Sequence, residues 1–243
     1  MNDTKKHAAG RLISQALSFT AVLILLLSAI LVLSEPAPAE GAGSTETITL
    51  PAPALKGTLS VEAAIAGRRS VRGFSDAAIT LRQLSQLLWA AQGITSEDGT
   101  RRAAPSAGAK YPMEVFVVAG KVEGLPAGVY RYVPKGHSLA LLKKGDVREA
   151  LCAEALSQQS VASAPASIVI AGVYERTRGK YGERAERYVH IEVGAVAENV
   201  YLEAESLGLA TVFMGAFSDG GVREVVGTGE AEPLGIMPVG ARS

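Results

Sequence analysis

The sequence predicts an α+β sandwich, in which helices flank a β-sheet. Apolar runs typical of strands and amphipathic helical patterns follow one another without the strict strand–helix alternation of a doubly wound fold. No repeat of fixed period is visible. Hydrophobic residues make up 48% and charged residues 20% of the 243 residues, as in globular proteins. One folded domain with additional segments is therefore expected.

The first segments differ from the rest of the chain. Residues 1–11 are positively charged, and residues 12–33 form an apolar run without charge, long enough to cross a bilayer core of about 30 Å. This pattern predicts a transmembrane anchor with the domain on the non-cytoplasmic (periplasmic or extracytoplasmic) side. One alternative is a signal peptide cleaved near Ala39, which would give a secreted protein. A buried core helix is the other alternative, although no amphipathic stripe is visible.

Residues 34–58 are rich in proline, alanine, glycine, serine and threonine, which predicts a linker and places the folded domain at residues 59–243. The whole chain has 24 basic and 24 acidic residues. Without Lys5, Lys6, Arg11 and Asp3, 21 basic and 23 acidic residues remain, so the domain has no positive charge that would attract it to a membrane surface.

In the first half of the domain, Ser60 can cap a helix that Gly67 ends. Thr80 and Gln83 form a capping-box pattern before an amphipathic helix that stops at Gly93. Runs of β-branched and aromatic residues then predict strands at 114–119 and 129–133.

In the second half, Asp146 and Glu149 can cap a helix over 148–159, and the apolar run 167–173 predicts a central strand. A long helix is expected at about 183–207. Further expected elements are a strand at 210–213, a helix at 221–226 and a strand at 234–239. The long helix carries a small-residue face suited to close packing at a subunit interface: Ile191, Gly194, Ala195, Val196, Ala197, Val200 and Ala204.

Composition excludes several classes of function. A pI of about 6.9 lacks the basic excess of a general nucleic-acid binder. One cysteine allows no internal disulfide, and three scattered histidines do not indicate a multi-histidine metal site. No dinucleotide-binding G-x-G-x-x-G after a strand and no Walker A sequence occurs.

Three segments could bind a ligand. Residues 68–74, RRSVRGF, place three arginines and a serine within five positions, which suits bidentate binding of phosphate. Residues 104–112, APSAGAKYP, are small enough for a planar ligand to approach the backbone. Residues 207–217 end a strand in a Gly-Ala pair with backbone N–H groups free to face a ligand. A solvated basic turn, a surface loop and plain core are the respective alternatives.

Together these segments resemble the nitroreductase family of FMN-dependent oxidoreductases, most closely its SagB-type (azoline-oxidase-like) branch. The segments KYGERAERYVHIEVGAVAENVYLEAESLGLATVFMGAF and EPLGIMPVG extend the match to about residues 60–240. The resemblance implies a three-layer sandwich with a mixed, mostly antiparallel sheet. It also implies a homodimer with FMN at the subunit interface.

The resemblance also implies site residues. Arg68 and Ser70 would contact the FMN phosphate, Arg69 the ribityl or phosphate side, and Arg72 the flavin ring near N1 and O2, where a cation favours reduction. Small residues would line the two sides of the ring: Ser106, Ala107 and Gly108 on one side, and Met214, Gly215 and Ala216, with a backbone N–H for N5, on the other.

Lys180 and Tyr181 match a pair that the azoline-oxidase branch uses in proton removal, and a desolvated lysine near a flavin can act as a base. An exposed charged loop is the alternative. The Gly-His and Gln-Asn pairs common in that branch are here Gly194-Ala195 and Glu198-Asn199, which puts azole-forming chemistry in doubt.

The expected function is two-electron hydride transfer by a ping-pong mechanism. The substrate is a small molecule or a peptide, and the electron donor is NAD(P)H, another donor or the substrate itself. No nucleic-acid partner is expected. The alternatives are a membrane-tethered, non-catalytic flavin-binding module and a flavin-modifying enzyme.

Overall fold

The computed structural model describes residues 46–243, and Thr45–Ser243 form one compact unit with its own hydrophobic core. A unit with its own core is expected to fold without the rest of the chain. The expected anchor at 12–33, the positive segment before it and the cleavage site near Ala39 lie outside the described residues. Among residues 46–243, no helix has the length and apolar character needed to cross a membrane.

A seven-stranded sheet in the order β1-β6-β5-β3-β7-β9-β8 forms the middle of the domain, and every neighbouring pair is antiparallel. Among the described residues, parallel pairing occurs in a separate two-stranded sheet, β2-β4, and in a bridge between Ser70 and Thr211. The bounds are Thr47–Thr49 (β1), Ile79–Thr80 (β2), Met113–Ala119 (β3), Val122–Glu123 (β4), Gly128–Val133 (β5), Ser138–Lys144 (β6), Ala166–Gly172 (β7), Ala210–Thr211 (β8) and Glu232–Gly240 (β9).

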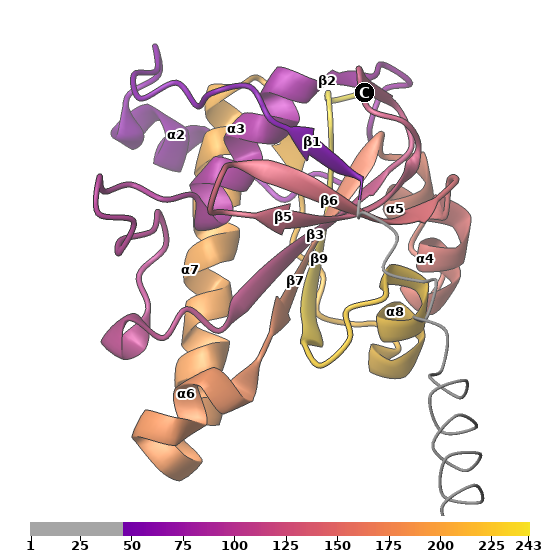
Figure 1. The fold of residues 1–243 in the computed structure, drawn as a ribbon. Coiled ribbons are helices and arrows are strands. Elements are labelled where there is room, and N and C mark those ends of the chain that lie inside the picture. The colour runs from indigo at the N-terminus through magenta and orange to yellow at the C-terminus, as the bar shows by residue number, and fades with distance from the viewer. Residues whose placement is uncertain (1–45) are drawn as a thin grey trace, which may run out of the picture. The chain divides into compact units, whose positions relative to one another are not determined.

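Helices cover both faces of this sheet (Figure 1), so the expected α+β three-layer arrangement is confirmed. Alternating residues of the central strands enter two separate cores: Val117 and Ile168 pack in one, and Phe116 and Val169 in the other. The first core contains residues of α3 (Leu81–Gln92) and α7 (Ala185–Ser206), beside α2 (Val61–Gly67) and α6 (Tyr174–Tyr181). The second contains residues of α4 (Arg148–Glu154), α5 (Gln159–Ser163) and α8 (Asp219–Val226).

The first two helices begin where the sequence predicts. The Ser60 hydroxyl accepts a hydrogen bond from the Ala63 N–H at the start of α2. At the start of α3 the Thr80 hydroxyl accepts from the Gln83 N–H, and the Gln83 side chain accepts from the Thr80 N–H, which completes the capping box.

One helical prediction in the second half is wrong in extent. The helix expected over 148–159 ends at Glu154, because Leu156 and Ser157 adopt positive φ, and α5 follows as a separate helix. The Asp146 carboxylate accepts a hydrogen bond from the Arg148 N–H, as expected. The N-cap residue is Val147, however, and the Glu149 side chain makes no capping bond. The sequence predicted no element for the charged stretch before residue 183, and the structure has helix α6 there.

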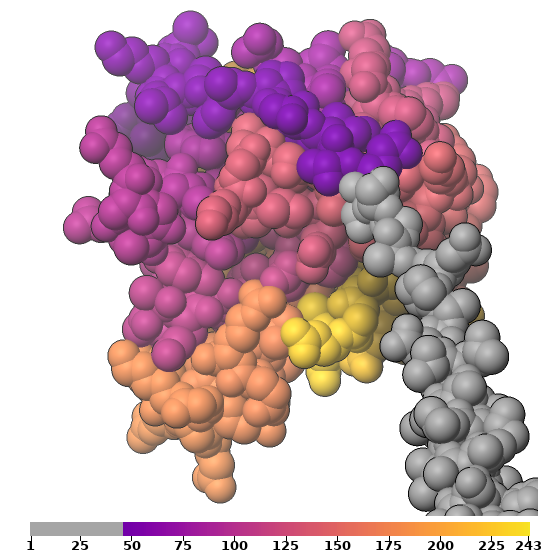
Figure 2. All heavy atoms as spheres, in the orientation of Figure 1, coloured from indigo at the N-terminus to yellow at the C-terminus, as the bar shows by residue number. Residues whose placement is uncertain are grey.

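The expected linker is wrong for its last part, because residues 46–56 are packed on the domain. Strand β1 pairs with β6, and the Leu50 N–H donates to the His137 carbonyl. Gln86 on α3 then holds Ala54 through both of its amide atoms. We call residues 46–58 the strap; it forms the indigo band across one face of the molecule (Figure 2). The folded domain therefore begins near residue 46 rather than residue 59.

Helix α7 divides the expected small-residue face into two. Val196, Ala197, Val200 and Ala204 are buried against the sheet and α3, whereas Ile191 and Gly194 are exposed and Ala195 is half-buried. The outer stripe is therefore a surface of this chain, and a Cβ added at Gly194 would meet no atom within 4 Å.

Candidate functional site

The arginine segment begins where α2 ends, so its first side chains leave the end of a helix. The Arg68 guanidinium lies 5.1 Å from the centroid of the Tyr201 ring on α7 and 4.0 Å from the Glu198 carboxylate. The Arg69 guanidinium folds back and donates to the carbonyls of Ala66 and Arg68. Arg72 is exposed. Arg68 and Arg72 are thus open to a ligand, while part of Arg69 is occupied in closing the helix.

Tyr201 joins the arginine segment to the Gly-Ala segment. Its hydroxyl lies 2.9 Å from the Ser70 hydroxyl and accepts a hydrogen bond from the Phe213 N–H at 2.7 Å. Beside this contact, the Val71 N–H donates to the Thr211 carbonyl. Two of the three predicted segments therefore lie side by side, although they are about 140 positions apart in sequence.

Sequence reasoning missed Tyr201. Its side chain is buried, and a buried tyrosine normally has a partner for its hydroxyl. An aromatic residue with a polar tip on the inner side of a long helix was the available signal.

The Gly-Ala segment offers a ligand less than the sequence suggested. Met214 is buried, and its N–H donates to the Ile236 carbonyl at 2.9 Å, so this N–H is not free for flavin N5. Gly215 and Ala216 are exposed. A ligand could reach these two residues.

The third segment, Ser106-Ala107-Gly108, packs against the other end of α7 and against α6. The Ala107 N–H donates to the Glu192 carboxylate at 2.8 Å, and the Ser106 hydroxyl accepts from the Tyr111 N–H. Gly108 has a φ of +59°, and a Cβ there would lie 2.6 Å from Lys180 Nζ and 2.7 Å from the Tyr181 hydroxyl. The predicted ring-edge loop and the predicted Lys-Tyr pair are therefore in direct contact.

Glu192 is a second residue that sequence reasoning missed. Its side chain is buried, and this burial raises the pKa of the carboxyl group, while hydrogen bonds from the Ala107 N–H and the Ser106 hydroxyl lower it in part. A single acidic residue within the buried face of the helix was the available signal. The carboxylate fixes the backbone of the loop that carries Ser106–Gly108.

One chain does not bring all the predicted residues together. Tyr201 follows Glu192 by nine positions, which corresponds to about 14 Å along the helix axis and about half a turn around it. The arginine and Gly-Ala segments lie near Tyr201, and the Ser106–Gly108 loop with Lys180 and Tyr181 lies near Glu192. Each chain thus carries two separate half-sites on α7.

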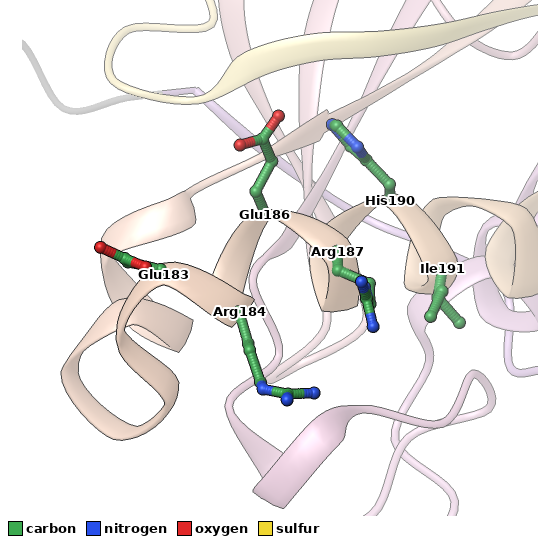
Figure 3. A pocket seen from close by; sticks show the side chains of 6 residues that line it. All are labelled: Glu183, Arg184, Glu186, Arg187, His190 and Ile191. Carbon is green, nitrogen blue, oxygen red and sulfur yellow. The ribbon is translucent and has the colours of Figure 1, made fainter.

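A hollow of about 690 Å³ lies over the start of α7. Its lining is mostly charged. Glu186 and His190 project from one side of the helix, and Arg184 and Arg187 project from the other, beside the apolar Ile191 (Figure 3). The His190 ring lies 2.7 Å from the Tyr174 hydroxyl, whose pKa is raised to about 12 by burial and by nearby carboxylates. The predicted cofactor residues do not line this hollow.

Comparison with known proteins identifies relatives over the whole folded part. The model of the Nitroreductase family matches residues 65–241. A protein of Methanocaldococcus jannaschii named as a nitroreductase, MJ1384, is 47% identical over 184 residues, which cover 76% of this chain and 92% of that protein.

Two proteins named for the processing of trifolitoxin and of microcin B17 are more distant relatives. The trifolitoxin-processing protein TfxB of Rhizobium leguminosarum bv. trifolii is 32% identical over 45% of this chain and 31% of its own length. The microcin B17-processing protein McbC of Escherichia coli is 26% identical over 58% of this chain and 54% of its own length.

Solved structures agree on the fold. A crystal structure from Ralstonia eutropha JMP134, described as a nitroreductase, superimposes with a TM-score of 0.71 at 30% identity, covering 86% of this chain and 96% of that one. The McbBCD microcin synthetase complex of E. coli gives a TM-score of 0.63 at 21% identity, over 89% of this chain and 82% of that chain.

Proposed function

Because this chain belongs to the nitroreductase family and is an oxidoreductase of that family, we propose that it is FMN-dependent. It would exchange two electrons with a small molecule or a peptide, taking them from NAD(P)H, another donor or the substrate itself. The observation that carries the proposal is the Ser70–Tyr201–Phe213 contact, which joins the arginine segment to the Gly-Ala segment.

The described residues are compatible with FMN. Arg68, half-buried over the Tyr201 ring, and the Ser70 hydroxyl present donors to a phosphate, and Arg72 is free to lie near N1 and O2 of the ring. Gly215 and Ala216 leave a neighbouring surface without long side chains. Bound FMN would supply the two-electron carrier, and the residues of the chain would bind and orient it.

We propose that a homodimer completes the site. The exposed stripe of Ile191, Gly194 and Ala195 lies near the middle of α7, level with the Glu192 half-site and on the N-terminal side of the Tyr201 half-site. If two copies packed these stripes antiparallel, the Ser106–Gly108 loop of one copy would face the arginine segment of the other. The second copy would thus supply the ring edge that the first lacks.

Lys180 and Tyr181 would then stand beside the flavin ring of the other copy. The side chains of both residues lie against the loop backbone at Gly108. A lysine amine held beside a flavin ring belongs to the groups that can act as a general base toward a substrate. This arrangement supports a role of the pair in proton transfer.

The phosphate role of the arginine segment is tested by removing it. We expect the Arg68→Ala, Ser70→Ala double variant to lose flavin, because a charge-assisted phosphate contact and a hydroxyl donor are both absent. The measurement is the flavin-to-protein ratio from the visible spectrum of the purified protein. Arg223→Ala on α8 is the control. Stoichiometric flavin in the double variant would contradict the assignment, and unaltered protein that binds no added FMN would contradict the flavin-dependent function.

For the N-terminus, we propose that residues 12–33 anchor the domain outside the cytoplasm. The supporting features are the uncharged apolar run and the positive residues before it. The mature N-terminus tests this proposal, because a start at Glu40 would show cleavage and secretion.

A further inference from the structure

A second cavity, of about 640 Å³, lies on the face of the sheet that α2, α3 and α7 cover. The strap and the start of α2 form one wall, α3 forms another, and the C-terminal half of α7 forms a third. Its volume is within the range of about 300–1,000 Å³ that is typical of small-molecule sites. None of the twelve residues assigned above to flavin binding or proton transfer lines it.

The cavity wall is fixed in place and mostly apolar. Gln86 donates its amide N–H to the Ala54 carbonyl and accepts from the Ala54 N–H, so the strap is held against α3 at the cavity edge. The apolar lining comes from all three walls and includes Leu55, Leu59, Trp89, Leu202 and Leu207. Such a surface suits the apolar body of a small ligand.

One acidic side chain lies inside this apolar lining. Glu203 on α7 is half-buried, and its burial raises the pKa of the carboxyl group, while a hydrogen bond from Gln86 partly offsets the rise. The basic residues of the lining, Lys56 and Arg82, are both exposed. Solvent screens exposed charges strongly, so the carboxylate is the group that selects a ligand head.

We propose that this cavity binds a small apolar amine. Its ammonium group pairs with the Glu203 carboxylate, and its apolar body packs against Trp89 and the leucines of the lining. An ammonium group would supply hydrogen bonds that replace those the Glu203 carboxylate lost to water on burial. The indole ring of Trp89 is the kind of aromatic ring that attracts a cation most strongly. The site takes an organic cation, separately from the redox centre.

Trp89 gives a direct readout, because it is the only tryptophan of the chain. The compact unit, residues 45–243, is titrated with 3-phenylpropylamine, 3-phenylpropanol and 3-phenylpropionate while Trp89 fluorescence is recorded. These probes share one apolar body and differ in their heads. We expect saturable binding of the amine, at least about tenfold weaker binding of the alcohol, and no binding of the acid. Equal binding of all three, or no saturable change, would overturn the proposal.

A variant assigns the selectivity to one residue. Glu203→Gln should weaken amine binding about tenfold and leave alcohol binding unchanged, which also shows that the cavity is intact. Glu224→Gln on α8, on the opposite face of the sheet, is the matched control and should change neither. If Glu203→Gln binds the amine as tightly as the unaltered protein, the carboxylate is not the selecting group. If only monomeric fractions respond and dimers do not, a second copy fills the cavity and the proposal fails.

Discussion

At the scale of single residues, the candidate site depends on contacts between segments that are distant in sequence. Tyr201 holds Ser70 beside Phe213, and Glu192 holds the backbone of the Ser106–Gly108 loop. Both residues lie in the segment that extends the family resemblance, but their roles could not be assigned from it, because each role depends on what the fold places opposite the side chain. The arginine cluster and the small-residue loops could be predicted, since their composition alone indicates ligand contact.

Gly108 makes a testable case at this scale. Gly108→Ala is expected to destabilise the domain by about 1–2 kcal/mol from its positive φ alone, and by more because the new Cβ would crowd Lys180 and Tyr181. Gly99→Ala is the matched control, since Gly99 also has positive φ but open space around it. Urea unfolding of both variants is the measurement. Equal losses would show that Lys180 and Tyr181 do not crowd this position.

At the scale of elements, local signals predicted the helix starts and some of the ends. The capping hydrogen bonds of Ser60 and of the Thr80–Gln83 box each join residues within four consecutive positions, so the starts of α2 and α3 were predictable. The end of α4 was not, because Leu156 and Ser157 take positive φ without being glycine or asparagine. Strand β6 was also missed, although the turn 134–137 joins it to β5 as a hairpin; its other neighbour, β1, is distant in sequence.

The exposed stripe of helix α7 can be tested as the dimer interface. Gly194→Leu should leave the monomer at least as stable, because glycine is a poor helix residue by about 1 kcal/mol and its surroundings are open. In a dimer that packs α7 against α7, the leucine would keep the helices apart. We expect the variant to sediment as a monomer and to lose flavin.

Gly220→Leu on α8 is the control for this experiment, because Gly220 is also helical and has open space around it. It should retain both dimer and flavin. A Gly194→Leu protein that remains dimeric would exclude the outer stripe of α7 as the interface.

At the scale of the whole molecule, the strap contacts three parts of the domain: strand β6, helix α3 and the turn between β5 and β6. His137, in the turn between β5 and β6, lies at the centre of these contacts. Its ring lies 2.7 Å from the Ser85 hydroxyl on α3 and 2.8 Å from the Tyr132 hydroxyl, and the Ser85 hydroxyl donates to the Pro51 carbonyl. Burial lowers the pKa of His137.

This lowered pKa predicts how stability depends on pH. The unfolded chain binds a proton at His137 near pH 6.5, before the folded chain does, so stability is full above that pH and falls as the pH drops below it. His137→Asn tolerates the positive φ at this position and should reduce the slope between pH 5 and 7. It should also lower stability by about 1–3 kcal/mol at pH 8 through lost hydrogen bonds.

Urea unfolding of residues 45–243 at several pH values measures both effects. An unchanged slope in His137→Asn would assign the pH dependence to other groups.

The short strand β1 has a consequence for the solubility of the chain. It covers the outer edge of β6, and the opposite edge of the sheet ends in the two-residue strand β8. Long uncovered edges are templates for strand addition between molecules, and short or lysine-bearing edges suppress it. Beyond β1, the edge of β6 carries Lys143 and Lys144. A chain from which residues 1–49 have been removed would expose the rest of the β6 edge, including Leu139. Such a chain should aggregate by pairing edge to edge.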